Sequence, residues 1–180
     1  MLIVLDRDGV INEDSDEYIK TPDEWIPING SLEAIARLNQ VGHQVVVVSN
    51  QSGIARGYYD DEMLAKIHEK MTEMLSAVGG HLDGIFYCPH HPDENCKCRK
   101  PKTGLLEKAI LNHNIDVSIS FLIGDRMLDI EAGNKIGLKT VIIPEKIDMV
   151  DEEMLKTEAR PDYYSTNFID GVNWILDNTK

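Results

Sequence analysis

The sequence has few cysteines, a deficit of positive charge and no long apolar run. Its three cysteines all lie between positions 88 and 98, so no disulfide framework is expected. Acidic residues outnumber basic ones by 31 to 18, and the net charge of -13 disfavours nucleic acid and anionic membranes as partners. No apolar stretch approaches the ~20 residues that cross a bilayer, and Met1 leads into a strand-like run without the basic flank of a signal peptide. We therefore expect a cytoplasmic protein.

Length and apolar content favour one domain over residues 1–180. The chain has 180 residues, of which 42% are hydrophobic, and this is enough for one core. Short apolar runs alternate with helical patterns, which predicts an open α/β sheet whose strands are mostly parallel. The predicted strands are Leu2–Leu5, Val45–Val48, Ile85–Tyr87, Phe121–Ile123 and Thr140–Ile143.

Five stretches have the apolar spacing of amphipathic helices. They cover residues 31–41, 60–78, 103–112, 128–136 and 168–177, and Gly42 ends the first. Ser31 is the expected N-cap of the first, because its hydroxyl can accept from a free backbone amide. The acidic stretch 145–158 has weak periodicity, so we expect it on the surface and assign it no chemistry.

Two carboxylates follow the first predicted strand. Asp6 and Asp8 come directly after Leu5, at the carboxyl edge of a parallel sheet, where α/β folds build their sites. A carboxylate nucleophile divides phosphate-ester hydrolysis into formation and hydrolysis of an aspartyl-phosphate, each easier than direct attack by water. A second carboxyl group can protonate the leaving alkoxide and then deprotonate the attacking water. We therefore predict that Asp6 is the nucleophile and Asp8 the general acid and base.

Further polar groups follow the second and fourth predicted strands. Ser49 and the amides after it can donate to phosphate oxygens, and Asp125 adds a third carboxylate at the same edge. Hard oxygen ligands suit Mg²⁺, which keeps several waters and bridges to phosphate. The residues alone predict a magnesium site made by Asp6, Asp125 and the Asp8 backbone carbonyl. Asp129 is equally well explained as a charge at a helix N-terminus.

The three cysteines and a nearby histidine form a predicted metal site. Cys88 and His90 precede Cys96 and Cys98, with five residues between the two pairs, which lets the chain fold around a tetrahedral ion. His91 is the competing histidine ligand. Four protein ligands leave no open position, so we predict structural Zn²⁺ that organises a loop at about 88–98 and does not activate water.

A basic cluster follows the last thiol in an otherwise acidic protein. Arg99 and Lys100 begin one residue beyond Cys98, so a fixed zinc loop would aim them. Lys100 can screen the charge that builds on a transferring phosphoryl group. The planar fork of Arg99 can hold another anionic part of the substrate.

Four short motifs resemble, in order, those of the phosphatases of the haloacid dehalogenase (HAD) superfamily. They are Asp6-Arg7-Asp8-Gly9-Val10, Ser49-Asn50-Gln51-Ser52-Gly53, Lys100, and Gly124-Asp125-Arg126 followed by Asp129. The zinc quartet, Arg99 and the run SNQSGIARG are similar to the subgroup of heptose bisphosphate phosphatases and histidinol-phosphatase domains. The resemblance spans about residues 2–141. It implies a Rossmann-like fold, with helices on both faces of the sheet and no separate cap domain.

The resemblance also implies a role for each matched position. The catalytic residues are Asp6 as nucleophile, Asp8 as general acid and base, and Ser49 and Lys100 as contacts to the phosphoryl group. Mg²⁺ is held by Asp6, Asp8 and Asp125, and Zn²⁺ by Cys88, His90, Cys96 and Cys98. The substrate pocket contains Asn50, Gln51, Ser52, Arg99 and Arg126, with Asp14 and Tyr18 as further contributors.

The implied substrate is a small phosphorylated sugar. Our leading hypothesis is removal of the C7 phosphate of a heptose bisphosphate on the route to nucleotide-activated heptose for surface polysaccharide, by an enzyme that needs only one protomer. Histidinol phosphate is the alternative, because acidic residues at 13–17 can face an aminoalcohol. An alternative from another class is a non-catalytic module that docks a partner through its zinc loop.

Overall fold

The computed structural model describes residues 1–113, 115–144 and 154–179. Within these residues one sheet of parallel strands has the order β3-β2-β1-β4-β5-β6. The strands are β1 (Leu2–Leu5), β2 (Gln44–Asn50), β3 (Gly84–Cys88), β4 (Phe121–Gly124), β5 (Lys139–Ile142) and β6 (Tyr163–Tyr164). The five predicted strands are confirmed, and none of their ends differs from the prediction by more than two residues. The short edge strand β6 was not predicted.

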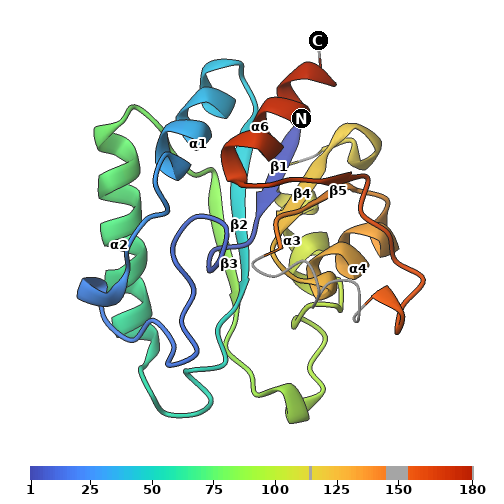
Figure 1. Ribbon diagram of the computed structural model, residues 1–180. Helices are drawn as coiled ribbons and strands as arrows, with labels where there is room; N and C mark the ends of the chain where they lie inside the picture. The colour runs from blue at the N-terminus through green and yellow to red at the C-terminus, as the bar shows by residue number, and fades with distance from the viewer. Residues whose placement is uncertain (114, 145–153, 180) are drawn as a thin grey trace.

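Helices cover both faces of the sheet, as the alternation of side chains along the strands requires (Figure 1). One face carries α1 (Ser31–Gln40), α2 (Asp61–Ala77) and α6 (Phe168–Asp177), and the other carries α3 (Gly104–His113) and α4 (Met127–Ile136). Ile3 and Leu5 of β1 pack under the first group, whereas Leu2 and Val4 pack under the second. The central strand is thus buried on both sides.

The five predicted helices are present and begin within one residue of their predicted starts. Asp60 caps α2, because its carboxylate accepts a hydrogen bond from the Met63 amide at 2.8 Å. The expected capping role of Ser31 is wrong. The N-cap of α1 is Gly30, and the Ser31 hydroxyl instead donates to the Ile11 carbonyl at 2.7 Å, which ties the helix to the loop after β1.

Among the described residues, the loops that follow β1 and β2 contain no inserted domain. Between β1 and α1 the chain forms only the short 3-10 helix η1 (Pro22–Glu24), and residues 51–60 alone connect β2 to α2. The zinc-site loop extends below β3 at the same end of the molecule (Figure 1). The parallel sheet with helices on both faces is the expected fold class, and the absence of a separate cap domain stays a prediction.

Two further predictions concern the acidic stretch 145–158 and the absence of a membrane span. Residues 145–153 of the acidic stretch 145–158 lie outside the described residues. Among the residues that the structure describes, none of the helices has the length and apolar character needed to cross a membrane.

Candidate active site

Asp6 stands at the tip of β1, where its backbone amide donates to the Ile123 carbonyl of β4 at 2.9 Å. Lys100 approaches from the segment after the zinc-site loop and places Nζ 3.0 Å from Asp6 Oδ1 and 2.6 Å from Asp129 Oδ1. The same ammonium donates to the Val48 carbonyl at 2.6 Å. The ammonium is thus held by one hydrogen bond and two ion pairs, and a buried cation lies beside the predicted nucleophile.

Three carboxylates gather around this point. Ligand oxygens of Asp6, Asp125 and Asp129 all lie within 4.8 Å of one another, and Asp125 Oδ1 is buried without a hydrogen-bond partner. Gly9 (φ 78°) brings the loop after β1 against Asp125, since a Cβ there would lie 2.6 Å from Asp125 Oδ2. An unpartnered buried carboxylate oxygen among other oxygen donors fits Mg²⁺.

The electrostatics of the cluster favour a cation as well. Burial raises the pKa of Asp6 to about 6, although the Lys100 charge acts in the opposite direction. Burial, together with the charges of Asp6 and Asp129, raises the pKa of Asp125 to about 8. Burial would lower the pKa of Lys100, but the two carboxylates that it contacts outweigh this and raise it. The cluster has more negative charge than Lys100 alone balances.

The Asp8 carboxylate lies outside this cluster and faces Arg7. The Arg7 guanidinium reaches Asp8 Oδ1 at 2.9 Å and Oδ2 at 3.0 Å, and Asn12 donates to Oδ1 at 2.9 Å. Burial would raise the pKa of Asp8, but the Arg7 charge and the hydrogen bonds from Asn12, Arg7 and Gln51 lower it overall. The Asp8 carboxylate is therefore not part of the group formed by Asp6, Asp125 and Asp129, and a metal contact through the Asp8 backbone carbonyl stays a prediction.

The residues after β2 connect the site to its surroundings. Asn50 donates to the Lys100 carbonyl at 3.2 Å and accepts from the Lys100 amide at 3.0 Å, so it fixes the backbone of that lysine. Ser49 is buried and accepts from Gln51 Nε2 at 2.7 Å. The structure thus gives Asn50 and Gln51, both predicted to bind substrate, contacts within the protein.

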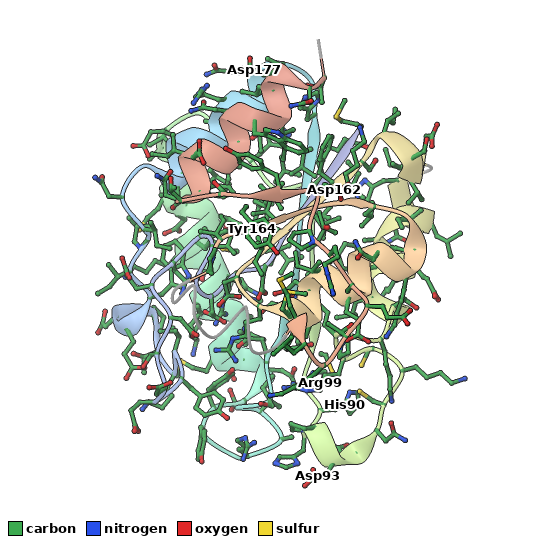
Figure 2. All side chains as sticks on the ribbon, turned by 45° about the vertical axis from the view of Figure 1, so that its right-hand side comes forward. His90, Asp93, Arg99, Asp162, Tyr164 and Asp177 are labelled. Atoms are coloured by element: carbon green, nitrogen blue, oxygen red, sulfur yellow. The ribbon has the colours of Figure 1, made fainter. Side chains whose placement is uncertain are left out.

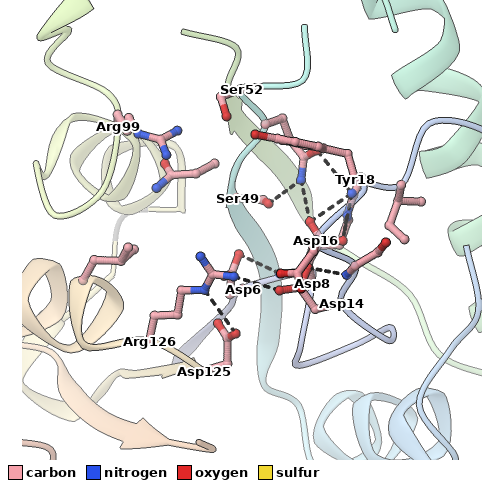
Figure 3. A pocket seen from close by; sticks show the side chains of 16 residues that line it. Asp6, Asp8, Asp14, Asp16, Tyr18, Ser49, Ser52, Arg99, Asp125 and Arg126 are labelled. Atoms are coloured by element: carbon pink, nitrogen blue, oxygen red, sulfur yellow. Dashed lines mark hydrogen bonds and ion pairs between the residues drawn. The ribbon is translucent and has the colours of Figure 1, made fainter. Parts of the chain in front are cut away.

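A pocket of about 260 Å³ opens above these groups (Figure 3). Its lining contains Asp6, Asp8, Ser49, Asp125 and every predicted substrate residue: Asp14, Tyr18, Asn50, Gln51, Ser52, Arg99 and Arg126. Arg126 pairs with Asp14 at 2.8 Å, which links the loops after β4 and β1 across the opening. Arg99 Nη1 is buried and has no hydrogen-bond partner. Because Arg99 also lines the pocket, its guanidinium is a candidate contact for an anionic ligand.

The predicted zinc residues come together at the end of β3. Ligand atoms of Cys88, His90, Cys96 and Cys98 lie within 4.8 Å of one another, and the three sulfur atoms are 3.2 to 3.5 Å apart. Sulfur ligands around a tetrahedral Zn²⁺ lie about 3.8 Å apart, so a small outward shift of these gathered side chains would accommodate the ion. His91, the competing ligand, instead accepts from the Asp93 amide and caps a short turn. Figure 2 labels His90 and Arg99 at the same end of the molecule, and His90 Nδ1 lies 3.2 Å from the sulfur of Cys98, which precedes Arg99 in the chain.

Sequence reasoning missed a buried polar network behind Asp8. Arg7 is 1% exposed, and its Nη1 lies 3.4 Å from His68 Nε2 on α2. Because a guanidinium only donates, that imidazole nitrogen is an acceptor, and burial with the nearby Arg7 charge lowers the pKa of His68 to about 4. The Tyr59 hydroxyl donates to Gln51 Oε1 at 2.6 Å. The available signal was Arg7, a basic residue between two acids directly after a buried strand.

Comparison with known proteins identifies a family model and relatives that share one enzyme name. A family model described as HAD-hydrolase-like matches residues 97–171. The chain is 51% identical over 142 residues to the D-glycero-beta-D-manno-heptose-1,7-bisphosphate 7-phosphatase of Pseudomonas aeruginosa, across 79% of this chain and 80% of that protein. Its identity to the protein of the same name from Neisseria meningitidis is 45%, across 79% of this chain and 76% of that one.

The fold comparison agrees with the sequence relatives. The crystal structure of D,D-heptose 1,7-bisphosphate phosphatase from B. bronchiseptica, complexed with magnesium and phosphate, has a TM-score of 0.90 and 37% identity over 98% of both chains. The corresponding enzyme from Burkholderia thailandensis has a TM-score of 0.73 and 32% identity over 97% of both chains. The chain therefore belongs to the HAD superfamily and, within it, to the family of the D-glycero-beta-D-manno-heptose-1,7-bisphosphate 7-phosphatases.

Proposed function

We propose that this enzyme hydrolyses the C7 phosphate of D-glycero-D-manno-heptose 1,7-bisphosphate. The observation that carries the proposal is the shared pocket of Asp6 and Arg99, in which Arg99 has a buried nitrogen without a partner. A bisphosphate presents one phosphate for reaction and a second that needs a cationic contact. The names and the extent of identity of the relatives support the same substrate.

The proposed reaction begins with attack of an Asp6 carboxylate oxygen on phosphorus, opposite the C7 oxygen. The phosphorus–oxygen bond to the sugar breaks, and Asp8 gives its proton to the leaving alkoxide. Water then attacks the aspartyl-phosphate and loses a proton to Asp8, which releases inorganic phosphate and restores Asp6. A phosphate dianion beside Asp8 opposes its negative charge and favours the protonated form that the first step needs.

Several residues stabilise the charge that moves during these steps. Lys100 offers its ammonium beside Asp6, and Ser49 offers a hydroxyl at the same edge of the sheet. Asp6 and Asp125, with the Asp8 backbone carbonyl, would hold Mg²⁺. When bound, that ion supplies positive charge to the phosphoryl oxygens. The zinc cluster would keep the segment with Arg99 and Lys100 in place.

The deciding experiment measures phosphate release in the presence of Mg²⁺ from the heptose bisphosphate, histidinol phosphate and several sugar monophosphates. We expect the largest kcat/KM for the bisphosphate. An Arg99→Gln variant should lose about tenfold or more in kcat/KM for the bisphosphate and much less for a monophosphate, because it removes one charge-assisted contact. Lys97→Gln, an exposed change in the same loop, is the control.

A preference for histidinol phosphate would contradict the heptose assignment while leaving the reaction type in place. Asp14 and Asp16 line the pocket and are the groups that an aminoalcohol would contact. Asp14 is, however, paired with Arg126. That the enzyme works as a single-domain, cytoplasmic monomer stays a prediction, which limited proteolysis, cell fractionation and light scattering test.

A further inference from the structure

Gln51 lies at the centre of the buried contacts between the two ends of the site. It is 3% exposed, and its backbone amide donates to the Cys88 carbonyl at 2.8 Å. Its side-chain Nε2 donates to Asp8 Oδ2 at 2.8 Å and to Ser49 Oγ at 2.7 Å. Its Oε1 accepts from two other groups. The four side-chain contacts use both hydrogens and both oxygen lone pairs of the side-chain amide.

The orientation of this amide is determined by its two donors. Arg7 Nη2 lies 3.2 Å from Gln51 Oε1, and the Tyr59 hydroxyl lies 2.6 Å from it. A guanidinium can only donate, so the atom facing Arg7 must be the carbonyl oxygen of the amide. The nitrogen then has to face Asp8 and Ser49. Tyr59 can approach because position 53 is glycine, where a Cβ would lie 2.8 Å from the Tyr59 oxygen.

This orientation has one consequence for Ser49 and another for Asp8. Because Ser49 Oγ accepts from Gln51, its single hydroxyl hydrogen is left for another acceptor, such as a phosphate oxygen in the pocket that Ser49 lines. Asp8 Oδ2 is held between Gln51 and Arg7, which limits the directions in which this carboxyl group can reach a leaving oxygen. One amide thus sets the geometry of both groups.

We propose that Gln51, held by Arg7 and Tyr59, is a positioning residue that orients Asp8 for proton transfer and Ser49 for phosphate binding. It acts through these two side chains and does not contact the substrate, because its hydrogen-bonding capacity is used within the protein. The inference rests on the proposed function, since it takes Asp8 as the acid that protonates the leaving group.

The test compares two substrates that differ in their need for an acid. A sugar alkoxide leaves poorly without a proton, whereas 4-nitrophenolate is a stable anion that leaves without one. The measured quantity is the ratio of kcat/KM for the heptose bisphosphate to kcat/KM for 4-nitrophenyl phosphate, which reports only steps up to phosphoryl transfer. Lost phosphate binding lowers both values together. Lost orientation of Asp8 lowers the ratio.

We expect Gln51→Met to lower this ratio about tenfold, a part of the roughly 100-fold or larger contribution of a general acid. Tyr59→Phe removes one hydrogen bond to Gln51 and should lower the ratio about fivefold. Tyr87→Phe is the matched control, because its hydroxyl donates to Asp61 outside this network, and its ratio should equal that of the parent. If Gln51→Met does not fold, as judged by circular dichroism, Tyr59→Phe decides.

An Asp8→Asn variant distinguishes an error in the positioning role of Gln51 from an error in the acid role of Asp8. If it lowers the ratio but Gln51→Met and Tyr59→Phe leave the ratio at the parent value, the positioning role is wrong and the proposed mechanism stands. If Asp8→Asn itself leaves the ratio unchanged, the role of Asp8 is wrong and the positioning inference goes with it. A lower ratio in all three variants, with the parent ratio in Tyr87→Phe, supports the inference.

Discussion

Lys100 Nζ lies 2.6 Å from Asp129 Oδ1, and neither side chain is more than 2% exposed. Asp129 therefore has two roles. Its Oδ2 accepts from the Arg126 amide at 3.2 Å at the start of α4, and its Oδ1 pairs with Lys100. The contact fixes the ammonium beside Asp6. A lysine on a flexible stem gains a defined position from this buried carboxylate.

A Lys100→Met variant should lower kcat about 100-fold to 1,000-fold, the usual cost of removing a donor that faces the developing charge. Its free energy of unfolding in Mg²⁺-free buffer should fall by about 3 kcal/mol, because Asp129 is left buried without its cation. Lys97→Met is the control and should match the parent, since Lys97 is exposed. Steady-state kinetics and urea denaturation measure the two effects. An unchanged kcat would contradict the role given to Lys100.

Replacement of the nucleophile should abolish turnover. Asp6→Asn keeps the size of the side chain but cannot form an aspartyl-phosphate, so no phosphate release above background is expected. Mass spectrometry of acid-quenched parent enzyme during turnover should detect one phosphoryl group per chain, and none in Asp6→Asn. Asp23→Asn, an exposed change in η1, should behave as the parent. A label on another residue would identify a different nucleophile.

The carboxylate cluster makes stability depend on pH and Mg²⁺. The folded pKa of Asp125, about 8, exceeds the ordinary value of 3.8, so the folded state binds the extra proton between these values and loses stability as pH rises through them. His68 has a folded pKa of about 4, so its contribution makes stability rise with pH, but only between about pH 4 and pH 6.5.

Zinc-loaded protein in Mg²⁺-free buffer should therefore become less stable between about pH 6.5 and pH 8.5, and Asp125→Asn should reduce this slope. Added Mg²⁺ should raise the melting temperature more at the upper end of the range, because the ion binds the deprotonated cluster. Differential scanning calorimetry on both proteins checks the prediction. Equal slopes would show that Asp125 has an ordinary pKa.

The fold was largely predictable from the sequence because apolar runs and helical stripes were strong. The edge strand β6 was missed, since two residues cannot establish a strand pattern. Ser31 was assigned as a cap because hydroxyl residues favour that place, yet a tertiary contact with Ile11 uses its hydroxyl. Local preference was overridden by a partner twenty positions away in the chain.

The site was predictable where residues share a strand end and less so where contacts depend on side-chain direction. The sequence placed Asp6 and Asp125 at one edge, and the structure brings them together. The sequence did not show that the Asp8 carboxylate pairs with Arg7, or that the Gln51 side chain hydrogen bonds within the protein. Asp6 and Asp8 lie beyond the end of β1, so strand alternation does not set the direction of their side chains. Partners such as Lys100 and Gln51 come from segments distant in the sequence.

The zinc cluster offers the last prediction, because it links a structural ion to the catalytic segment. Elemental analysis should find about one zinc per chain, and Cys96→Ser should lose the ion and lower the melting temperature. Activity should fall together with zinc content, since Arg99 and Lys100 follow the ligand Cys98 directly. His91→Ala is the matched control and should retain zinc, because His91 caps a turn and lies outside the cluster. A Cys96→Ser protein that stays fully active and equally stable would separate this loop from catalysis.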